Sequence, residues 1–563
     1  MTINYAKMFN RRVTPQSLPI PGSTQVRNSN SGYGWAVDDW TRLDRFLILG
    51  AEGGTYYLAE RELVKQNHDA VVRCLQADGV RAVNRIVEIS ETGRAPKNEP
   101  AIFALALVAT HGDATAKAHA FANLARVCRI GTHLFHFAEY VNAMRGWGRG
   151  LRNAVGRWYV DRGADDLAHQ AVKYQQRDGW SHADLLRLAH PKAPSGQHDA
   201  VFRWMLAGPE ALGEREVKRK VGAQNRVAKY GAVGELPKLI NAFEQAKRAT
   251  IPGEIVKLID EYDLPREAIP TQWLNEVVVW DALLERMPLT AMIRNLGKMT
   301  SLGLLQPYSE AKQLIVRKLR DATALQRARI HPFAVLVAQK VYTQGHGEKG
   351  SLKWTPVPGV VDALDQAFYA TFPNVEPCGK PVLLALDVSG SMATSMVAGS
   401  CLSAREASAA MALVTAATEP EHEIIAFSAA AGGHGGKWGG GEPGITRVDL
   451  TPHLRLAEVI QRLAAIPMGG TDCALPLLWA ARNKLHVSGF ITYTDSETWA
   501  GNLHPAQALR KYRGEFVADA KAVVVGLTSN GFTFADPADR GMLDVVGFDT
   551  TAPAVIADIV RSE

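Results

Sequence analysis

The chain has 563 residues, of which 21% are charged and 47% are of hydrophobic types, a balance that excludes an intrinsically disordered chain. The formal net charge of +6 is unevenly spread: residues 371–563 carry 14 Lys and Arg against 20 Asp and Glu, whereas residues 1–370 carry 49 against 37. The basic part is the candidate for a polyanionic partner such as RNA or DNA, although many solvated helices with excess Lys and Arg would give the same balance.

Other composition features narrow the class of protein. No apolar run is long enough to predict a membrane-spanning helix, and the N-terminus, Met1–Lys7, lacks the apolar stretch of a signal peptide. The 5 Cys are scattered and form no Cys-x-x-Cys pair, so neither a disulfide framework nor a zinc site is expected. We therefore expect a cytoplasmic protein with no membrane contact.

Residues 1–55 are predicted to be irregular, apart from a short helix over 39–49. From residue 56 to 344, apolar residues recur at spacings of three and four, with turn residues between the runs, and no strand is expected. Helices are predicted over residues 101–110, 114–128, 134–144, 150–160, 165–176 and 183–188, among others. Short loops make consecutive helices antiparallel neighbours, so residues 1–360 are predicted to form an α-solenoid of HEAT-like repeats.

The pattern changes after residue 345, where glycine and proline become frequent. We predict a linker over residues 361–379 and a second domain over residues 380–563, in which strands and helices alternate. Strands are predicted over residues 382–386, 423–427, 446–450, 489–494 and 522–527, and helices over 402–417, 453–465, 505–511 and 552–560, with another helix from residue 472. This order is typical of a doubly wound α/β domain, so the fold class is multi-domain, a helical solenoid followed by an α/β domain.

Polar side chains cluster where strands of this α/β domain are predicted to end. Asp387, Ser389 and Ser391 follow the first apolar strand, Thr471 lies in a glycine-rich loop, and Asp495 follows the strand 489–494. Ligand sites of doubly wound sheets lie at the carboxyl ends of the strands, and hard cations take oxygen ligands. The loops could instead keep their hydrogen bonds without a metal.

In order and spacing these residues resemble the von Willebrand factor type A domain and its metal-ion-dependent adhesion site. The resemblance implies that Ser389, Ser391 and Thr471 coordinate Mg²⁺ or another divalent cation, with Asp387 and Asp495 acting directly or through water. It also implies an open coordination position for a carboxylate of a protein partner.

Several segments of the helical part are distinctive together: Val26-Arg27-Asn28 with Gly32-Tyr33, residues 43–57, 131–135, 146–149, 178–188, 287–297 and 329–333. They resemble the module shared by telomerase-associated, Ro and vault proteins, and that module followed by a type A domain is the layout of the Ro autoantigen family, here in its bacterial form. The resemblance implies a monomeric ring of helical repeats whose ends the type A domain joins. It also implies binding of small noncoding Y RNA outside, binding of single-stranded ends of misfolded or structured RNAs in the hole, a role in RNA quality control and degradation, and an exoribonuclease partner.

Candidate RNA-binding residues concentrate between residues 133 and 190. In the helix 150–160 the apolar positions form one stripe, which leaves Arg149 opposite it and Arg152 on its flank. Lys173 and Arg177 are predicted to share one helix face, four positions apart. Mixtures of cations, imidazoles and an aromatic ring are typical of single-stranded RNA sites. The candidates are His133, Arg149, Arg152, Lys173, Arg177, His182, Arg187 and His190, and solvated helix faces or a packed His182 are the plainer interpretation.

Two other segments carry weaker signals. The basic run Lys218–Lys220 would face the RNA or form a solvated loop. The glycine-rich stretch 432–444 lacks the Gly-Lys-Ser/Thr ending of a phosphate loop and is interpreted as a surface excursion, and Gly53-Gly54-Thr55 as a structural turn.

Three functions are compatible with these sequence features. We expect a non-catalytic RNA-binding ring, and the alternative is an Mg²⁺-dependent protein–protein scaffold built on the type A domain. A metal-dependent nuclease is disfavoured because the site lacks clustered carboxylates, and neither Gly-x-Ser-x-Gly nor His-Glu-x-x-His occurs.

Overall fold

The computed structural model describes residues 13–49, 60–95, 97–209, 215–221, 224–230, 235–347, 351–397, 400–428, 444–495, 498–527, 532–546 and 552–562, with the side chains of 60–68, 215–230 and 546 excepted. The segment 53–55, predicted as a turn, and all but the last residue of 432–444, predicted as a surface excursion, lie outside this description. The same holds for the side chains of the basic run 218–220.

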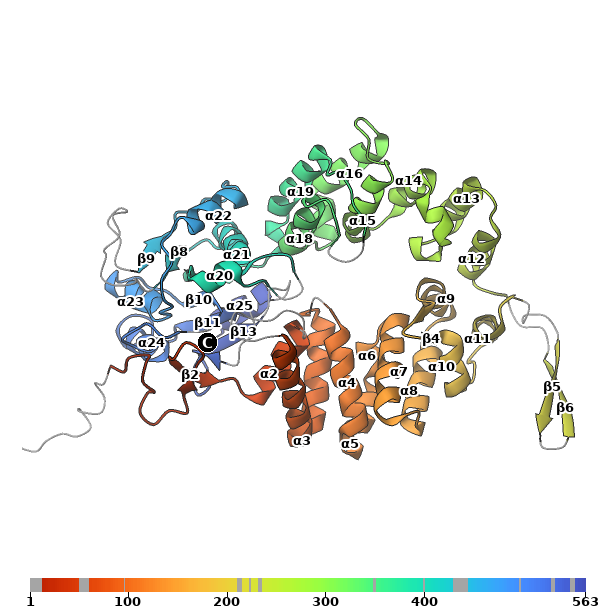
Figure 1. The fold of residues 1–563 in the computed structure, drawn as a ribbon, viewed down its shortest axis with the longest axis horizontal. Helices are drawn as coiled ribbons and strands as arrows, with labels where there is room; N and C mark the ends of the chain where they lie inside the picture. Colours follow the sequence, from red (N-terminus) through yellow and green to blue (C-terminus); the bar gives the residue numbers. More distant parts are fainter. Residues whose placement is uncertain are drawn as a thin grey trace, which may run out of the picture.

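Two rows of helices make up most of the molecule (Figure 1). The first row contains α2 (Asp39–Leu49), α3 (Glu60–Thr92), α4 (Glu99–His111), α5 (Ala114–Ala122), α6 (Leu124–Val127), α7 (Gly131–Arg145), α8 (Arg149–Val160), α9 (Ala164–Lys173), α10 (His182–Ala189) and α11 (Gly196–Ala207). The second contains α12 (Lys238–Arg248), α13 (Pro252–Tyr262), α14 (Val277–Arg286), α15 (Leu289–Ser301), α16 (Glu310–Arg320), α17 (Ala322–Arg327), α18 (Pro332–Thr343) and α19 (Pro358–Ala370), with 3-10 turns η2 (Arg266–Ala268), η3 (Thr271–Asn275) and η4 (Phe372–Asn374). Consecutive helices pack pairwise, so the prediction of a helical solenoid is confirmed.

Four details of the helical part differ from the predictions. It contains two hairpins, β3 (Gln176–Arg177) with β4 (Trp180–Ser181), and β5 (Arg215–Val221) with β6 (Gln224–Tyr230), where no strand was expected. The predicted helix 114–128 is two helices, α5 and α6, that meet at Asn123. Helix α9 ends at Lys173, not at residue 176. The short helix predicted over residues 361–371, at the start of the predicted linker, is present as α19, but its buried side chains pack on α16 and α18, which joins it to the helical part.

The α/β domain is a six-stranded sheet with helices on both faces. Its strand order is β13-β11-β10-β7-β8-β9, parallel except for β9. The strands are β7 (Val382–Asp387), β8 (His422–Phe427), β9 (Ile445–Arg447), β10 (Gly489–Thr494), β11 (Lys521–Gly526) and β13 (Met542–Val546), and the helices are α20 (Gly390–Thr394), α21 (Ala404–Thr418), α22 (Leu456–Ala464), α23 (Leu475–Arg482), α24 (Pro505–Glu515) and α25 (Ala552–Arg561). The prediction of a doubly wound domain is confirmed, although strand β13 was missed.

The N-terminal residues belong spatially to the α/β domain. Strands β1 (Val26–Arg27) and β2 (Tyr33–Ala36) pair with each other, and β2 also pairs with β12 (Phe532–Thr533), almost five hundred residues later in the chain. In Figure 1 this red segment lies against the blue C-terminal part. Residues 13–36, called the N-terminal arm below, are therefore not simply irregular as predicted.

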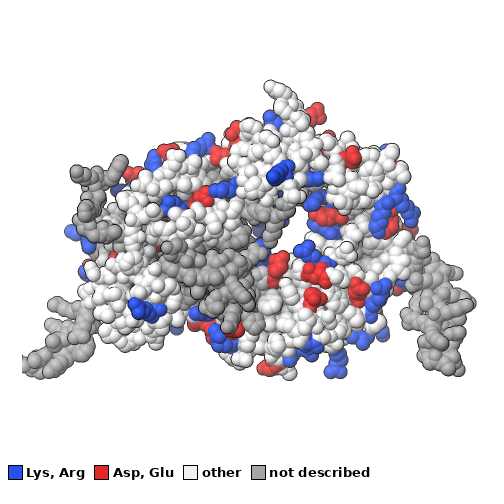
Figure 2. Space-filling model, in the orientation of Figure 1, with Lys and Arg blue, Asp and Glu red and all other residues white. Residues whose placement is uncertain are grey.

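The α/β domain contacts both ends of the helical part. At one end Arg45 of α2 forms an ion pair with Asp544 of β13 at 2.8 Å, and the exposed fractions of the two side chains are 1% and 9%. At the other end Lys340 of α18 pairs with Glu406 of α21, and Asp365 of α19 pairs with Arg455, which precedes α22. Helices α9 and α12 join the two rows at the far side. The result is a ring, and Figure 2 shows the opening between the two rows.

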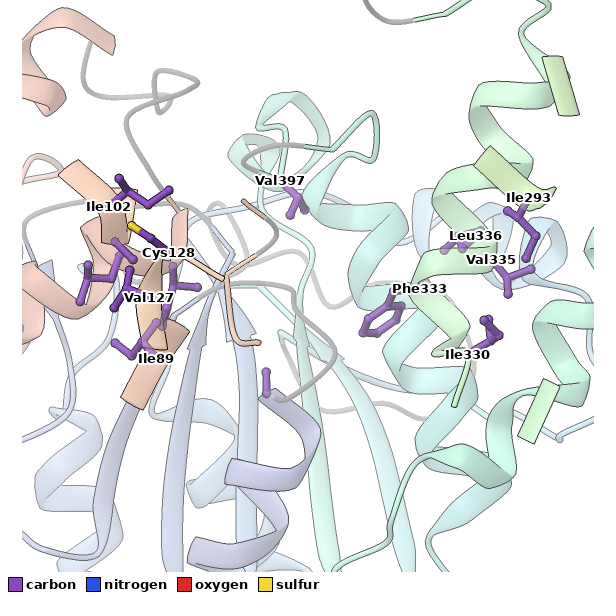
Figure 3. Packing of buried hydrophobic residues seen from close by; sticks show 14 of the residues in the cluster. Ile89, Ile102, Val127, Cys128, Ile293, Ile330, Phe333, Val335, Leu336 and Val397 are labelled. Atoms are coloured by element: carbon purple, nitrogen blue, oxygen red, sulfur yellow. The ribbon is translucent and has the colours of Figure 1, made fainter. Parts of the chain in front are cut away.

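The apolar core is divided by the pleat of the sheet. Leu384 and Leu386 on one face of β7 belong to the same buried cluster as the helical part, whereas Leu383 and Ala385 on the other face belong to a second cluster beneath α23 and α24. Figure 3 shows residues of the first cluster as separate groups, with Ile102 in the first row and Phe333 in the second. Because side chains of a strand alternate between its two faces, one face of the sheet continues the core of the solenoid and the other face packs against α23 and α24.

Candidate metal centre and candidate nucleic-acid interface

The predicted metal ligands converge at the carboxyl edge of the sheet. Asp387 ends β7, Asp495 follows β10, and these two strands are direct neighbours in the sheet. All five candidate side chains are buried: Asp387, Ser389, Ser391, Thr471 and Asp495. The topology of a parallel sheet therefore assembles a set of oxygen atoms that lie far apart in the sequence.

Hydrogen bonds hold Asp387 in one orientation. One carboxylate oxygen, Oδ1, accepts from the backbone N–H of Ser389 at 2.8 Å, and Oδ2 accepts from the hydroxyl of Thr494 at 2.7 Å. The hydroxyls of Ser389 and Ser391 lie 3.1 Å apart. Thr494 was not predicted as part of this site, although it is the residue before Asp495 at the end of the same strand.

The electrostatics of this edge favour a bound cation. Burial, with the Asp495 carboxylate nearby, raises the pKa of Asp387 well above its usual value. Two buried carboxylates repel each other unless a proton or a cation compensates their charge. Two carboxylates with three hydroxyls are an all-oxygen donor set of the kind that Mg²⁺ takes, so the residues present fit a hard divalent cation. Among the described residues no group of three or more His, Cys, Asp or Glu offers another metal site.

Two further residues hold the loops of this site. The carboxylate of Asp472, next to Thr471, accepts from the side-chain amide of Gln16 in the N-terminal arm at 2.7 Å. Gln16 is fully buried, with an exposed fraction of 0%. Nothing in the sequence around Gln16 pointed to this site, because the contact spans more than four hundred residues.

The predicted RNA-binding residues are divided between surface and interior. Five candidates are exposed: Arg149, Arg152, Arg177, Arg187 and His190. Lys173 and His133 are half-buried, and His182 is buried, with an exposed fraction of 4%. Exposed side chains are available to phosphates, whereas a buried one is not.

His182 is a packed core residue in this structure. Its Nδ1 is 2.7 Å from the hydroxyl of Tyr159, and its ring lies edge-on to Phe135 and stacks against Trp158. Desolvation lowers the pKa of His182 to about 4, so the ring is neutral at pH 7. The plainer interpretation, a packed histidine, describes its position here.

The exposed candidates lie on neighbouring elements. Arg152 Nε donates to the carbonyl of Ala189 at 3.2 Å, which places it beside His190 at the end of α10. Arg177 lies in the β3–β4 hairpin, and its strand partner Trp180 stacks on Trp147, two residues before Arg149. The structure thus brings Arg149 and Arg177 to one region of the first row through an aromatic pair.

Three local findings modify the predicted interface. Lys173 is the last residue of α9 and Arg177 is in a strand, so the prediction that they share a helix face is wrong. Tyr174 leaves the helical region with φ −120° and ψ 70°, which turns the chain into the hairpin. His133 lies at the start of α7, where its Nδ1 is 3.3 Å from Asn98 Nδ2 and burial lowers its pKa to about 4.

Comparisons with known proteins cover nearly the whole chain. The family model described as the TROVE domain matches residues 26–380, and the one described as the Ro60 vWA domain matches residues 381–560. The chain is 40% identical to a Deinococcus radiodurans protein named RNA-binding protein RO60, over 100% of this chain and 99% of that protein. It is 35% identical to a Caenorhabditis elegans protein of the same name, over 98% of this chain and 92% of that protein.

A solved structure shows the same architecture. The crystal structure of the Deinococcus radiodurans RO (RSR) protein matches with a TM-score of 0.70 and 40% sequence identity, covering 93% of this chain and 99% of that one. The two family models together span the helical part and the α/β domain that make up the ring. No described helix is long and apolar enough to cross a membrane.

Proposed function

The chain belongs to the Ro family, and from that premise we propose that it binds RNA through the helical ring and does no chemistry of its own. The observation that carries this proposal is similarity over the full length to relatives that are named RNA-binding proteins. The excess of Lys and Arg in residues 1–370 supports it, because cations attract the phosphate backbone without regard to sequence.

The outer part of the first row is the proposed contact surface for a small structured RNA such as Y RNA. It carries the exposed Arg149, Arg152 and Arg177 beside the stacked Trp147 and Trp180. Arginine binds phosphate and also stacks on bases, so this combination suits a folded RNA with unpaired nucleotides.

Single-stranded ends of misfolded RNAs are the proposed ligands of the central opening, where the chain would act in RNA quality control together with an exoribonuclease. Side chains of both signs border this opening in the view of Figure 2, so the attraction of its Lys and Arg for phosphate is partly offset by Asp and Glu. We therefore expect the opening to contribute less to affinity than the outer cations do.

Recovery of RNA from cells tests this proposal. The protein is crosslinked to RNA in its own cells, the complexes are purified under denaturing conditions, and the bound RNA is sequenced. A small noncoding RNA with crosslinks on α8, the β3–β4 hairpin or α10 supports the proposal. Crosslinks no more frequent than for a control protein of equal charge would remove it.

Mg²⁺ at the edge of the α/β domain is the second part of the proposal. Ser389, Ser391 and Thr471 would ligate the ion, with Asp387 and Asp495 compensating its charge directly or through water, and a partner's carboxylate would take the remaining position. Support comes from the buried all-oxygen donor set and the raised pKa of Asp387. Calorimetric titration of the full chain with Mg²⁺, alone and with Asp387→Ala, tests it: binding that the substitution does not remove would contradict the assignment.

The alternative, a scaffold that binds proteins through this metal site, uses the same residues without RNA. A protein ligand that requires Mg²⁺ in a preparation free of RNA would favour it.

A further inference from the structure

The N-terminal arm has no part in the proposed function, yet it carries the segment Val26-Arg27-Asn28 with Gly32-Tyr33 that stood out in the sequence. The structure explains this segment. Asn28 donates from Nδ2 to the backbone carbonyl of Thr498 at 2.8 Å, and its Oδ1 accepts from the backbone N–H of Gly32 at 2.8 Å. The segment therefore folds onto the loop that follows Asp495.

Gly32 is required by this close approach. A Cβ atom at Gly32 would lie 2.3 Å from the carbonyl oxygen of Thr498 and 2.7 Å from Trp499. Both contacts involve backbone atoms, so the loop itself would have to move. Arm and loop are thus packed at a distance that only glycine allows.

Gln16 ties together the two loops that carry metal candidates. Its Nε2 donates to Asp472 Oδ1 at 2.7 Å and to the carbonyl of Leu503 at 2.8 Å, and its Oε1 accepts from the hydroxyl of Thr498 at 2.5 Å. Asp472 is adjacent to Thr471, and Thr498 is three residues beyond Asp495. One buried amide from the other end of the chain therefore joins the two loops.

The two loops are also joined to each other through Thr471. Its carbonyl accepts from the backbone N–H groups of Trp499 and Ala500 at 3.0 and 3.1 Å, and the hydroxyl of Thr498 accepts from the N–H of Cys473 at 3.1 Å. A shift of the arm would therefore reach Thr471 and the loop after Asp495 together, since a buried amide and its partners move as one network.

The other end of the arm leads into the ring. After β2 the chain enters α2, whose Arg45 pairs with Asp544 of β13 and also donates to the carbonyl of Phe532 at 3.4 Å. Phe532 begins β12, the strand that pairs with β2 of the arm. The arm is thus continuous with the contact that closes the ring at this end.

We propose that the N-terminal arm couples the metal centre to the ring, with Gln16 and Asn28 as positioning residues that hold the 471–473 and 498–503 loops. Filling the centre fixes these loops, which tightens the arm and the seating of α2 on the α/β domain. Coupling of this kind is reciprocal, so a loosened arm weakens metal binding by the same factor. The inference rests on the proposed metal centre and concerns Mg²⁺ itself, whatever partner ligand the centre takes.

The test measures Mg²⁺ affinity and backbone hydrogen exchange on the full chain. In the wild type, Mg²⁺ should slow exchange in residues 13–36 and in α2, and Asp387→Ala should remove that effect. Gln16→Ala removes three hydrogen bonds and should weaken Mg²⁺ binding about tenfold, within the range of measured coupling energies. Gly32→Ala displaces the same loop by a steric contact and should act in the same direction.

Gln25→Ala is the matched control. Gln25 is a buried glutamine of the same arm, but its side chain bonds Ile20, Ser23 and His504 and neither of the two loops. It should keep Mg²⁺ affinity within about twofold of the wild type, less than the smallest typical coupling. An equal loss in Gln25→Ala would show that any damage to the arm lowers affinity, and would overturn the role of Gln16.

The remaining outcomes separate this inference from the metal assignment. If the wild type binds Mg²⁺ in an Asp387-dependent manner, but Gln16→Ala and Gly32→Ala bind as tightly and exchange in α2 does not respond, the coupling is contradicted while the metal centre stands. If the wild type binds no Mg²⁺, the metal centre and the coupling both fail.

Discussion

The candidate metal centre and the candidate RNA surface differ in how buried their residues are and in how closely these residues are grouped. All five metal candidates are buried and meet at one edge of a sheet, from three segments of the α/β domain. The eight RNA candidates range from the exposed Arg177 to the buried His182. A parallel sheet dictates where its strand ends lie, whereas a solenoid leaves each surface side chain to its own helix. Substitutions of the metal candidates should therefore have non-additive effects, whereas the effects of substituting the separate RNA candidates on binding free energy should add.

The largest expected effect is at the metal centre. Asp387→Ala should abolish Mg²⁺ binding, because the variant loses one of two buried charges and an anchor for Ser389 and Thr494. RNA affinity should stay unchanged, since the exposed cations lie on the helical part. Calorimetry with Mg²⁺ and a gel-shift titration with RNA measure the two quantities on one folded preparation. An equal loss of RNA affinity in this variant would show that the metal centre is part of the RNA-binding surface.

The next effect concerns the exposed arginines. A hydrogen bond to a charged group is worth about 1.5–3 kcal/mol, so replacing Arg149, Arg152 and Arg177 together by Ala should weaken binding of a small structured RNA about a hundredfold or more. The matched control replaces Arg317, Arg320 and Arg327, equally exposed on α16 and α17 of the second row. Gel-shift titrations should show little change in the control, and equal losses in both variants would mean that charge alone, not position, decides.

Acid should destabilise the interior of the helical part. Burial depresses the pKa of His182 from 6.5 to about 4 in the folded protein. Unfolded chains then bind more protons below pH 6.5, so the stability that the neutral His182 contributes is complete above pH 6.5 and is lost as the pH falls toward 4. Between pH 7 and 5 this residue alone should cost about 2 kcal/mol.

Urea unfolding at both pH values measures this loss. The variant His182→Gln, which cannot titrate, should show a shallower decrease than the wild type. An equal decrease in both proteins would assign the acid sensitivity to other groups, such as His133 and His331, whose pKa values burial lowers in the same way.

His182 should affect RNA binding only indirectly, by holding α10 and the adjoining hairpin in position. His182→Ser loses the contact with Tyr159 and loosens the start of α10 and the adjoining hairpin, so RNA affinity should fall about tenfold, the equivalent of one hydrogen bond. His182→Gln can still bond Tyr159 and should recover most of the affinity. If Ser and Gln weaken binding equally, the imidazole contacts RNA directly and the buried position described here is not the one that binds.

The sequence predicted what depends on local periodicity and on strand ends. Helix α8 and strand β10 agree with their predicted ranges to within one residue, because apolar spacing sets both, and the α8 stripe of Leu151, Val155, Trp158 and Tyr159 is buried as expected. Asp387 and Asp495 followed from the ends of predicted strands, Ser389 and Ser391 from the turn after the first strand, and Thr471 from a glycine-rich loop that the family resemblance singled out. Their ligation of a metal stays a prediction, as do the RNA contacts.

What the sequence did not predict depends on partners far along the chain. Strands β1 and β2 are too short to show a period, and β2 gains its place only by pairing with β12. Gln16 has no local signal because its partners follow almost five hundred residues later. The break after Lys173 was missed because Tyr174 ends the helix without a glycine or proline.

The salt dependence of RNA binding tests the central claim most directly. Affinity for a structured RNA with a single-stranded tail is measured at several salt concentrations, for the wild type and for the variant in which Arg149, Arg152 and Arg177 are replaced by Ala. We expect log affinity to fall steeply with log salt, and the slope of the variant to be smaller by about 0.7 for each single-strand phosphate that the variant no longer neutralises. A flat response in the wild type, or identical slopes in both proteins, would contradict an RNA surface made of these cations.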